Sequence, residues 1–211
     1  MTDRAVLRAE ILEAALTHVP FDGWTARALD LGAADLGLGG ADVGRAFPRG
    51  AIEALAAFLR RADVAMIEAL SGHDLEAMPV HKRVTLAVRL RLEGNEPYRE
   101  AIRRGLSILA LPFHGGLAVK SLYRTVDAIW TAAGDRSTDY NFYTKRMLLA
   151  GVYSTTLLYW LDDESKGRAD TWEFLDRRIR DVGRVPKALD RLRATADRLP
   201  DPSRLLRRRQ R

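Results

Sequence analysis

Apolar residues recur every three or four positions along most of this chain, which is the spacing of helices with one buried face. The pattern predicts a first helix that ends near Pro20 and a second that begins after Thr25, a residue well suited to an N-cap. A short third helix is expected over 41–47, and a fourth from Gly50 to about Leu70. The first third of the chain is therefore predicted to be helical.

The middle of the chain continues the same pattern. Cations alternate with apolar residues between Arg83 and Leu92, so a strand is an alternative to a helix in that segment. Pro97 then opens a helix that stops before Pro112, and another helix is predicted over 116–132. Gly134 is expected to cap it at its C-terminal end.

The least ambiguous segment is 138–161. Its second part, 147–161, holds fifteen residues without a charge and is apolar on every side of a 3.6-residue helix, which predicts a helix buried all round. The segment is too short to cross a bilayer, which needs about 20 apolar residues. It is therefore interpreted as the central helix of the domain.

The last part of the chain is predicted to form two helices. Thr171 is expected to cap the first, and Gly183 and Pro186 are expected to end it. The second is predicted over 187–199, with an apolar stripe flanked by cations.

The first four helices, with a Leu-Gly-Leu turn and a Phe-Pro pair between them, resemble the TetR-type DNA-binding domain over 11–59. Where regulators of this type place donors for phosphates and bases, this chain has mostly glycine, alanine and an acid. Those positions are Gly39, Gly40, Asp42, Gly44 and Ala46. Phosphate contacts dominate affinity for DNA, so this helix is not expected to bind nucleic acid specifically.

Composition narrows the function classes. The chain has 211 residues, 47% of them hydrophobic, and no cysteine, which excludes disulfides, thiolate metal sites and cysteine nucleophiles. The net charge of +6 is concentrated at the end, because residues 186–211 hold 9 basic and 3 acidic residues. A DNA-binding module carries its basic residues on the reading domain, so this location argues against one. The last helix could contact a membrane surface, pack against a second subunit or remain solvated, and reversible binding to a membrane surface is favoured. The distal sequence RLLRRRQR could instead contact nucleic acid nonspecifically.

No secretory signal stands at the start of the chain, where acids are interleaved at helical spacing. The expected location is the cytoplasm, peripheral on the inner membrane of a bacterial-type cell.

Four motifs in the second half carry a family resemblance. They are AGD, STDYNFYTKR, VYSTTLLYWLDD and TWEFLDRRI, all between Ala133 and Ile179, and RAFPRGAIEAL and LPFHGGLAVKSLYRTVDAIW add to them upstream. Together they resemble the ubiquinone-biosynthesis accessory proteins, lipid-binding partners of the di-iron demethoxyubiquinone hydroxylase. The resemblance implies an all-α homodimer with a TetR-type repressor-like fold, in which a helix-turn-helix-like subdomain precedes a larger helical ligand-binding domain.

The resemblance also implies three kinds of contact. A docking patch for the hydroxylase would contain Asp127, Trp130, Phe142, Tyr143, Lys145 and Arg146. A cavity for an isoprenoid quinone or other lipid is predicted to be lined by Leu149, Tyr153, Leu157, Tyr159 and Trp160. Membrane contact is predicted for Leu189, Leu192, Arg193 and Leu199 on the last helix.

Each set has a plain structural alternative. Phe142 and Tyr143 could pack the start of the central helix, although two adjacent aromatics on a helix cannot both face one core. Any one of the predicted cavity residues could instead fill an ordinary core. The predicted organisation is a subdomain over 1–61, a lipid-binding and docking domain over 62–182, and a basic helix and tail over 183–211.

Catalysis is not predicted. None of the four histidines has a glutamate three residues before it, so the Glu-x-x-His pairs of a di-iron bundle are missing, and no cofactor or metal is expected. The leading hypothesis is an accessory protein that presents a polyprenyl quinone intermediate to the hydroxylase. The alternatives are a TetR-type ligand-responsive transcriptional regulator, which the fold permits, and a small-molecule enzyme on a helical scaffold.

Overall fold

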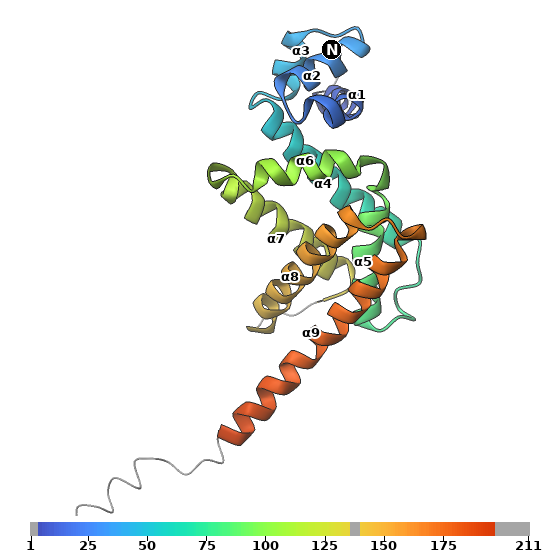
Figure 1. Cartoon of the computed structure of the whole chain (residues 1–211), viewed down its shortest axis with the longest axis vertical. Coiled ribbons are helices and arrows are strands. Elements are labelled where there is room, and N and C mark those ends of the chain that lie inside the picture. The colour runs from blue at the N-terminus through green and yellow to red at the C-terminus, as the bar shows by residue number, and fades with distance from the viewer. Residues whose placement is uncertain (1–3, 136–139, 197–211) are drawn as a thin grey trace, which may run out of the picture.

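The computed structural model of the chain describes residues 4–135 and 140–196, with side chains over 4–135 and 142–182. Within these ranges the chain is all-helical and contains no strand, as the sequence predicts. Figure 1 shows a small three-helix unit at one end, a larger body below it, and one long helix that leaves the body. The α-helices are α1 (Arg4–Asp22), α2 (Ala26–Asp35), α3 (Gly40–Ala46), α4 (Ala51–Ser71), α5 (Val80–Glu93), α6 (Arg99–Leu109), α7 (Gly115–Ala132), α8 (Tyr140–Asp162) and α9 (Ala169–Ala196). Short 3₁₀ turns are η1 (Glu96–Tyr98), η2 (Pro112–His114) and η3 (Lys166–Arg168).

The first three helices form the predicted helix-turn-helix-like unit. Thr25 caps α2, because its hydroxyl oxygen accepts a hydrogen bond from the Ala28 N–H at 3.3 Å. Helices α1 and α2 approach so closely at Gly32 that a Cβ there would lie 2.4 Å from the backbone nitrogen of Ala15. Only glycine fits this crossing, and it fixes how the two helices pack.

Helix α4 joins this unit to the body and runs unbroken through residue 61. The predicted division between 1–61 and 62–182 therefore lies inside one helix. The Trp24 indole N–H also donates to the Ala101 carbonyl in α6 at 2.8 Å, so a buried hydrogen bond ties the two parts together.

The segment that could have been a strand is helix α5, and its buried residues follow a helical period. They include Val84, Ala87, Val88 and Leu92. The predicted C-terminal cap of α7 is also present. Gly134 has a φ of +86°, a backbone conformation that residues other than glycine rarely adopt.

Helix α8 lies on the outside of the body, which corrects the prediction that it is buried all round. Its inner face packs against α7, α9 and α5, with Leu149 and Trp160 buried. Its outer face is open, and Met147 is 75% exposed on it. Apolar character on every side of a helix indicates burial only if every side meets a partner, and within the described chain one side of α8 meets none.

Helix α9 corrects two predictions. It runs without interruption from Ala169 to Ala196, through both Gly183 and Pro186. Helix α9 packs against α8 and α5, and its first half contributes the buried Leu175 and the partly buried Ile179 to the core. Thr171 lies in the first turn and is not the cap; the Asp170 N–H is instead accepted by the Ser165 hydroxyl at 3.1 Å.

Helices α6 and α7 meet at a sharp corner. No single helix in the described ranges is long and apolar enough to cross a bilayer. The segment formed by η1 and α6 and the segment formed by η2 and α7 together have the length and composition of a span, but they are bent by 101° at their junction.

Candidate functional site

The six residues predicted to dock a partner gather where the end of α7 meets the start of α8. We call this place the α7–α8 junction and define it by Asp127, Trp130, Asp135, Phe142, Tyr143, Lys145 and Arg146. The Trp130 indole N–H donates to the Lys145 carbonyl at 3.2 Å, and the Lys145 ammonium lies 2.9 Å from the Asp135 carboxylate. The two helices are therefore fastened together by the residues that the sequence singles out.

Arg146 is the internal cation of the junction. Arg146 is only 4% exposed. Its Nε lies 2.7 Å from the Asp127 carboxylate, and its Nη1 lies 3.4 Å from the Asp135 carboxylate. Its guanidinium also lies 3.4 Å from the centroid of the Phe142 ring. A buried cation with these partners cannot reach an external surface, so Arg146 positions its neighbours.

Tyr143 is the side chain that the junction presents to solvent. It is 65% exposed, and its ring meets the edge of the half-buried Phe142 ring with centroids 5.1 Å apart. The Asp127 and Lys145 side chains are partly exposed beside it. The adjacent aromatics thus divide as predicted, with one turned inward and one outward.

An apolar cavity of about 200 Å³ opens beside the junction, between α5, α7, α8 and α9. Its lining residues are His81, Val84, Trp130, Lys145, Leu148, Leu149, Val152, Ile179 and Val182. Trp130 and Lys145 therefore belong both to the junction and to the cavity wall. Of the five residues predicted to line a lipid cavity, Leu149 lies here. The lining residues on α5 and α9 were not predicted, although Ile179 and Val182 have the helical spacing of one face.

The other four predicted cavity residues do not share this space. Tyr153 and Leu157 line a separate void of about 30 Å³, room for little more than one water molecule. Burial raises the pKa of Tyr153. Tyr159 stacks on Phe174 with centroids 4.8 Å apart, at the wall of an open acidic groove. Trp160 is completely buried, with the Arg99 guanidinium 5.3 Å from its ring.

A buried ion-pair cluster lies next to the smaller void and was not found from the sequence. The Asp63 carboxylate accepts hydrogen bonds from Arg91 at 3.0 Å, Arg124 at 2.9 Å and Thr125 at 2.8 Å. Asp63 and Arg91 are both buried. Because the partners come from three helices and lie up to 62 residues apart, no local pattern announces them. The cluster joins α4, α5 and α7 behind α8.

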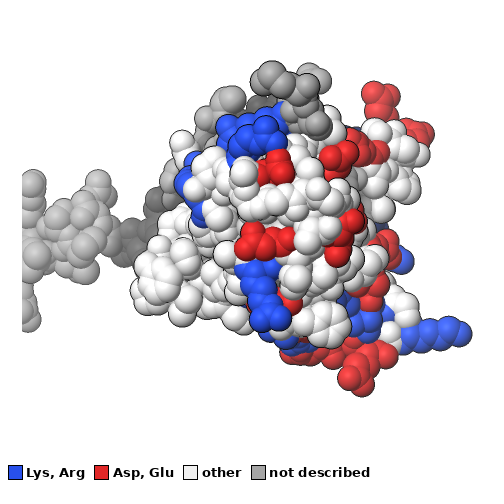
Figure 2. Space-filling view, turned by 90° about the horizontal axis from the view of Figure 1, so that it is seen from above, with Lys and Arg blue, Asp and Glu red and all other residues white. Residues whose placement is uncertain are grey.

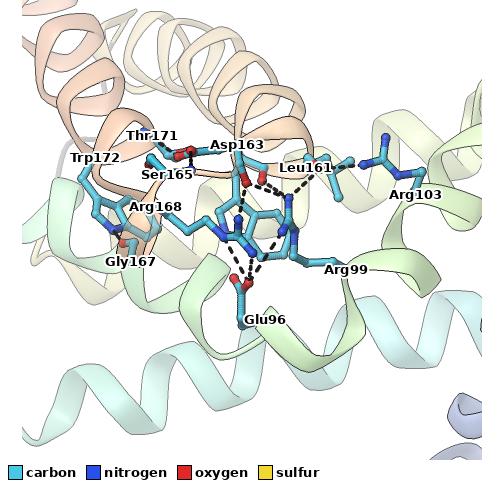
Figure 3. Close-up of polar contacts among 11 residues, drawn as sticks. Glu96, Arg99, Arg103, Leu161, Asp163, Ser165, Gly167, Arg168, Thr171 and Trp172 are labelled. Atoms are coloured by element: carbon cyan, nitrogen blue, oxygen red, sulfur yellow. Dashed lines mark hydrogen bonds and ion pairs between the residues drawn. The ribbon is translucent and has the colours of Figure 1, made fainter.

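The C-terminal end of α8 is held by arginines (Figure 3). Arg99 Nη2 donates to the carbonyls of Trp160 at 2.8 Å and Leu161 at 2.6 Å, and Arg103 Nη2 also donates to Leu161 at 2.6 Å. The last carbonyls of a helix have no partner within it and carry a partial negative charge, so cations are favoured there.

Asp163 connects this end of α8 to the start of α9. Its Oδ2 accepts hydrogen bonds from the Thr171 N–H at 2.9 Å and the Thr171 hydroxyl at 2.5 Å, and its Oδ1 accepts from the Ser165 N–H at 2.7 Å (Figure 3). Burial acts to raise the pKa of Asp163, but the hydrogen bonds from Ser165 and Thr171 outweigh it and hold that pKa well below its usual range. This carboxylate therefore fixes how α9 leaves α8.

Arg45 and Arg49, the two cations that the sequence places at α3, each lie next to an acid. Arg45 is paired with Asp42 on the same helix, and Arg49 lies 3.6 Å from the Glu53 carboxylate. These exposed pairs partly neutralise the cations that could have held phosphates there.

The predicted membrane contacts fall outside the described side chains. Leu189, Leu192 and Arg193 lie on the described backbone of α9 without described side chains, and Leu199 lies beyond residue 196. Among the described residues, no group of three or more histidines and acids is placed to hold a metal ion.

Comparison with known proteins adds to this geometry. A family model described as COQ9 matches residues 116–186. The chain is 38% identical to the mitochondrial ubiquinone biosynthesis protein COQ9 of Drosophila melanogaster, over 82% of this chain and 54% of that protein. It is 36% identical to the human protein of that name, over 92% and 63% of the two chains, and 34% identical to COQ9-B of Xenopus laevis, over 90% and 67%. The chain thus spans 54% and 63% of the length of the fly and human relatives.

A solved structure supports the fold alone. The crystal structure of a TetR transcriptional regulator from Nitrosomonas europaea superposes with a TM-score of 0.70 at 21% sequence identity, over 84% of this chain and 98% of that one. The predicted TetR-type fold is confirmed.

Proposed function

Because this chain belongs to the COQ9 family of ubiquinone biosynthesis proteins, we propose that it is a non-catalytic accessory protein that binds a polyprenyl quinone intermediate at a membrane surface. It would present this lipid to the di-iron demethoxyubiquinone hydroxylase. One observation supports the proposal most directly: Trp130 and Lys145 belong both to the α7–α8 junction and to the wall of the apolar cavity.

The cavity fits the apolar part of such a ligand. Six of its nine lining residues are aliphatic, and Trp130, His81 and Lys145 complete the wall. A hydrocarbon chain needs no hydrogen-bond partners, so this largely apolar lining is sufficient for it. Its volume of about 200 Å³ is below the roughly 300–1,000 Å³ of sites for drug-sized ligands. The cavity therefore suits part of an isoprenoid chain, and transfer from lipid into it avoids exposing apolar area to water at about 25 cal/mol per Å².

The junction fits the enzyme contact. Tyr143 is exposed to solvent, and its ring packs against Phe142 beside the ion pairs of the junction. Exposed aromatic side chains that are held in place by their neighbours are typical anchors of protein interfaces. A hydroxylase bound over Tyr143 would lie next to the cavity wall, so the cargo would be offered where the enzyme docks.

The open face of α8 is the surface we assign to a second copy of the chain. Met147 and Leu158 are exposed on it, and Gly151 and Thr155 between them are small. Two such faces can approach closely, since a homodimer interface presents the same patch from both subunits.

The test of the proposed function is the identity of the bound lipid. Organic extracts of the protein, purified from its own host, are expected to contain an isoprenoid quinone or its precursor by mass spectrometry. Extracts without any isoprenoid lipid would count decisively against the proposal.

A ligand-responsive transcriptional regulator is the alternative that the fold permits. The ion pairs of Arg45 with Asp42 and of Arg49 with Glu53 argue against a regulator. They partly neutralise the cations beside α3, and phosphate contacts dominate affinity for DNA. A salt-sensitive, sequence-selective site in a gel-shift assay would establish the regulator instead.

A further inference from the structure

The corner between α6 and α7 carries apolar side chains that the core does not use. We define this α6–α7 corner by Leu111, Phe113, Val119 and Tyr123, all exposed. Phe113 is 76% exposed, and its ring meets the ring of its neighbour His114, with centroids 4.5 Å apart. Figure 1 shows the corner projecting sideways from the body at the left end of α6.

Acidic side chains are missing from the chain around this corner. Residues 101–126 contain no aspartate or glutamate, while four cations occur there, namely Arg103, Arg104, Lys120 and Arg124. Arg103 forms an ion pair with Asp162 at 2.9 Å, and Arg124 forms one with Asp63 at 2.9 Å. Lys120 is exposed and forms no ion pair with the described part of the chain. Figure 2 keeps the left and right of Figure 1; its left-hand margin shows uncharged and basic side chains, and acidic ones lie in the centre and on the right.

We propose that the α6–α7 corner inserts its exposed apolar side chains into the headgroup region of an anionic lipid bilayer. Apolar and aromatic side chains beside a cation, with no acid in the sequence between Glu100 and Asp127, match the chemistry of such a surface, which is apolar below and negatively charged above. The bend of 101° places a turn, and not a membrane span, at the bilayer.

The shape of the corner favours a bilayer over another protein. A stable protein interface buries about 800 Å² on each partner and needs a broad complementary face. Leu111 and Phe113 lie at the turn, and Val119 and Tyr123 follow on α7. A fluid headgroup layer can surround such a narrow projecting ridge without a matching pocket. The aromatic rings of Phe113 and Tyr123 suit the interfacial depth at which such rings are enriched.

This contact is separate from the one predicted for the last helix and does not require that the protein bind a quinone. Helix α9 leaves the body toward the lower left in Figure 1, on the same side as the corner. Two contacts on one side would fix the orientation of the body on the membrane, which a single tail cannot do.

A site-specific label tests the insertion. The chain has no cysteine, so Phe113→Cys creates a single attachment point for an environment-sensitive dye. Phe21→Cys is the matched control, because Phe21 is a comparably exposed phenylalanine, 83% exposed, on α1 and outside the corner. On vesicles of phosphatidylcholine and phosphatidylglycerol we expect a blue-shifted, several-fold stronger emission at position 113 and no change at position 21. An unchanged label at 113 while the protein sediments with the vesicles overturns the proposal, as does a blue shift that appears without vesicles as the protein is concentrated.

A binding measurement supplies the second test. Leu111→Ser with Phe113→Ser is expected to weaken sedimentation with the anionic vesicles on the order of tenfold, since each side chain would lose part of the gain from burial. Lys120→Glu should weaken it further at low salt, while Phe21→Ser and Lys166→Glu should leave it unchanged. Thermal melts should be unaffected because these side chains are exposed. Equal binding by the corner variants and the wild type would refute the contact.

Discussion

The Trp130 indole N–H donates a hydrogen bond to the Lys145 carbonyl at 3.2 Å, and the Lys145 ammonium lies 5.6 Å from the centroid of the same indole ring. This pair joins α7 to α8 and forms part of the wall of the 200 Å³ cavity. A change on the outer side of the α7–α8 junction is therefore separated from the cavity by a single layer of side chains.

Tyr143→Lys is expected to weaken capture of the hydroxylase by about 30-fold, the loss typical of removing an interface hot spot of about 2 kcal/mol. Its ring is 65% exposed, so the helix content and the melting temperature should not change. Phe21→Lys, which also removes an exposed aromatic but far from the junction, should bind the enzyme normally. Unchanged capture by the Tyr143 variant would remove this residue from the docking surface.

Arg146→Met should behave differently because Arg146 is buried between Asp127 and Asp135. Removing one partner of a buried ion pair leaves charges uncompensated and typically costs about 3–5 kcal/mol. We expect a lower midpoint in denaturant and, as a consequence, weaker capture of the enzyme. Full stability with lost capture would instead show that Arg146 contacts the partner directly.

Filling the cavity should exclude the lipid without unfolding the protein. Val84→Phe places extra carbon atoms in a space of about 200 Å³, whereas the fully buried Val88, one turn later on α5, does not line the cavity. Val84→Phe is expected to keep wild-type stability and to lose the bound isoprenoid in mass spectra. Val88→Phe should be destabilised by about 1–3 kcal/mol through overpacking. Retention of the same lipid by Val84→Phe would place the ligand elsewhere.

The open face of α8 predicts an oligomer. Met147→Glu puts a charge on the face that we assign to a second copy, and sedimentation velocity is expected to show a shift from dimer to monomer. Val64→Glu, a matched change on the exposed face of α4, should leave the dimer intact. A dimer in both variants would move the interface to another surface.

The helices and their order could be predicted from the sequence because apolar spacing and local signals such as Thr25 and Gly134 act within a few residues. The residues predicted to dock a partner could be placed together only through the family resemblance. Which of them face outward could not be predicted, since the burial of Arg146 depends on Asp127 and Asp135, which approach it only when α7 and α8 pack.

The cavity was harder to predict for the same reason. A run of apolar residues in α8 does not reveal which side meets a neighbour, so Leu149 lines the cavity whereas Trp160 is fully packed and Tyr159 stacks at the surface. The continuous α9 likewise depends on tertiary packing of its first half, which local signals at Gly183 and Pro186 do not report.

The last prediction concerns Asp163, whose lowered pKa links the packing of α9 to pH. A carboxylate whose pKa is lower in the folded than in the unfolded chain stabilises the fold at pH values above its unfolded pKa, near 3.9 for aspartate, and this contribution is lost as the pH falls toward the folded pKa. Asp163→Asn removes the charge while keeping the shape of the side chain. The difference in unfolding free energy between wild type and variant should therefore be largest and constant from neutral pH down to about pH 5, and should shrink below about pH 4. Asp162→Asn, a change at the exposed neighbouring carboxylate, is the control, and a difference for Asp163→Asn that stays constant down to pH 3 would contradict the assignment.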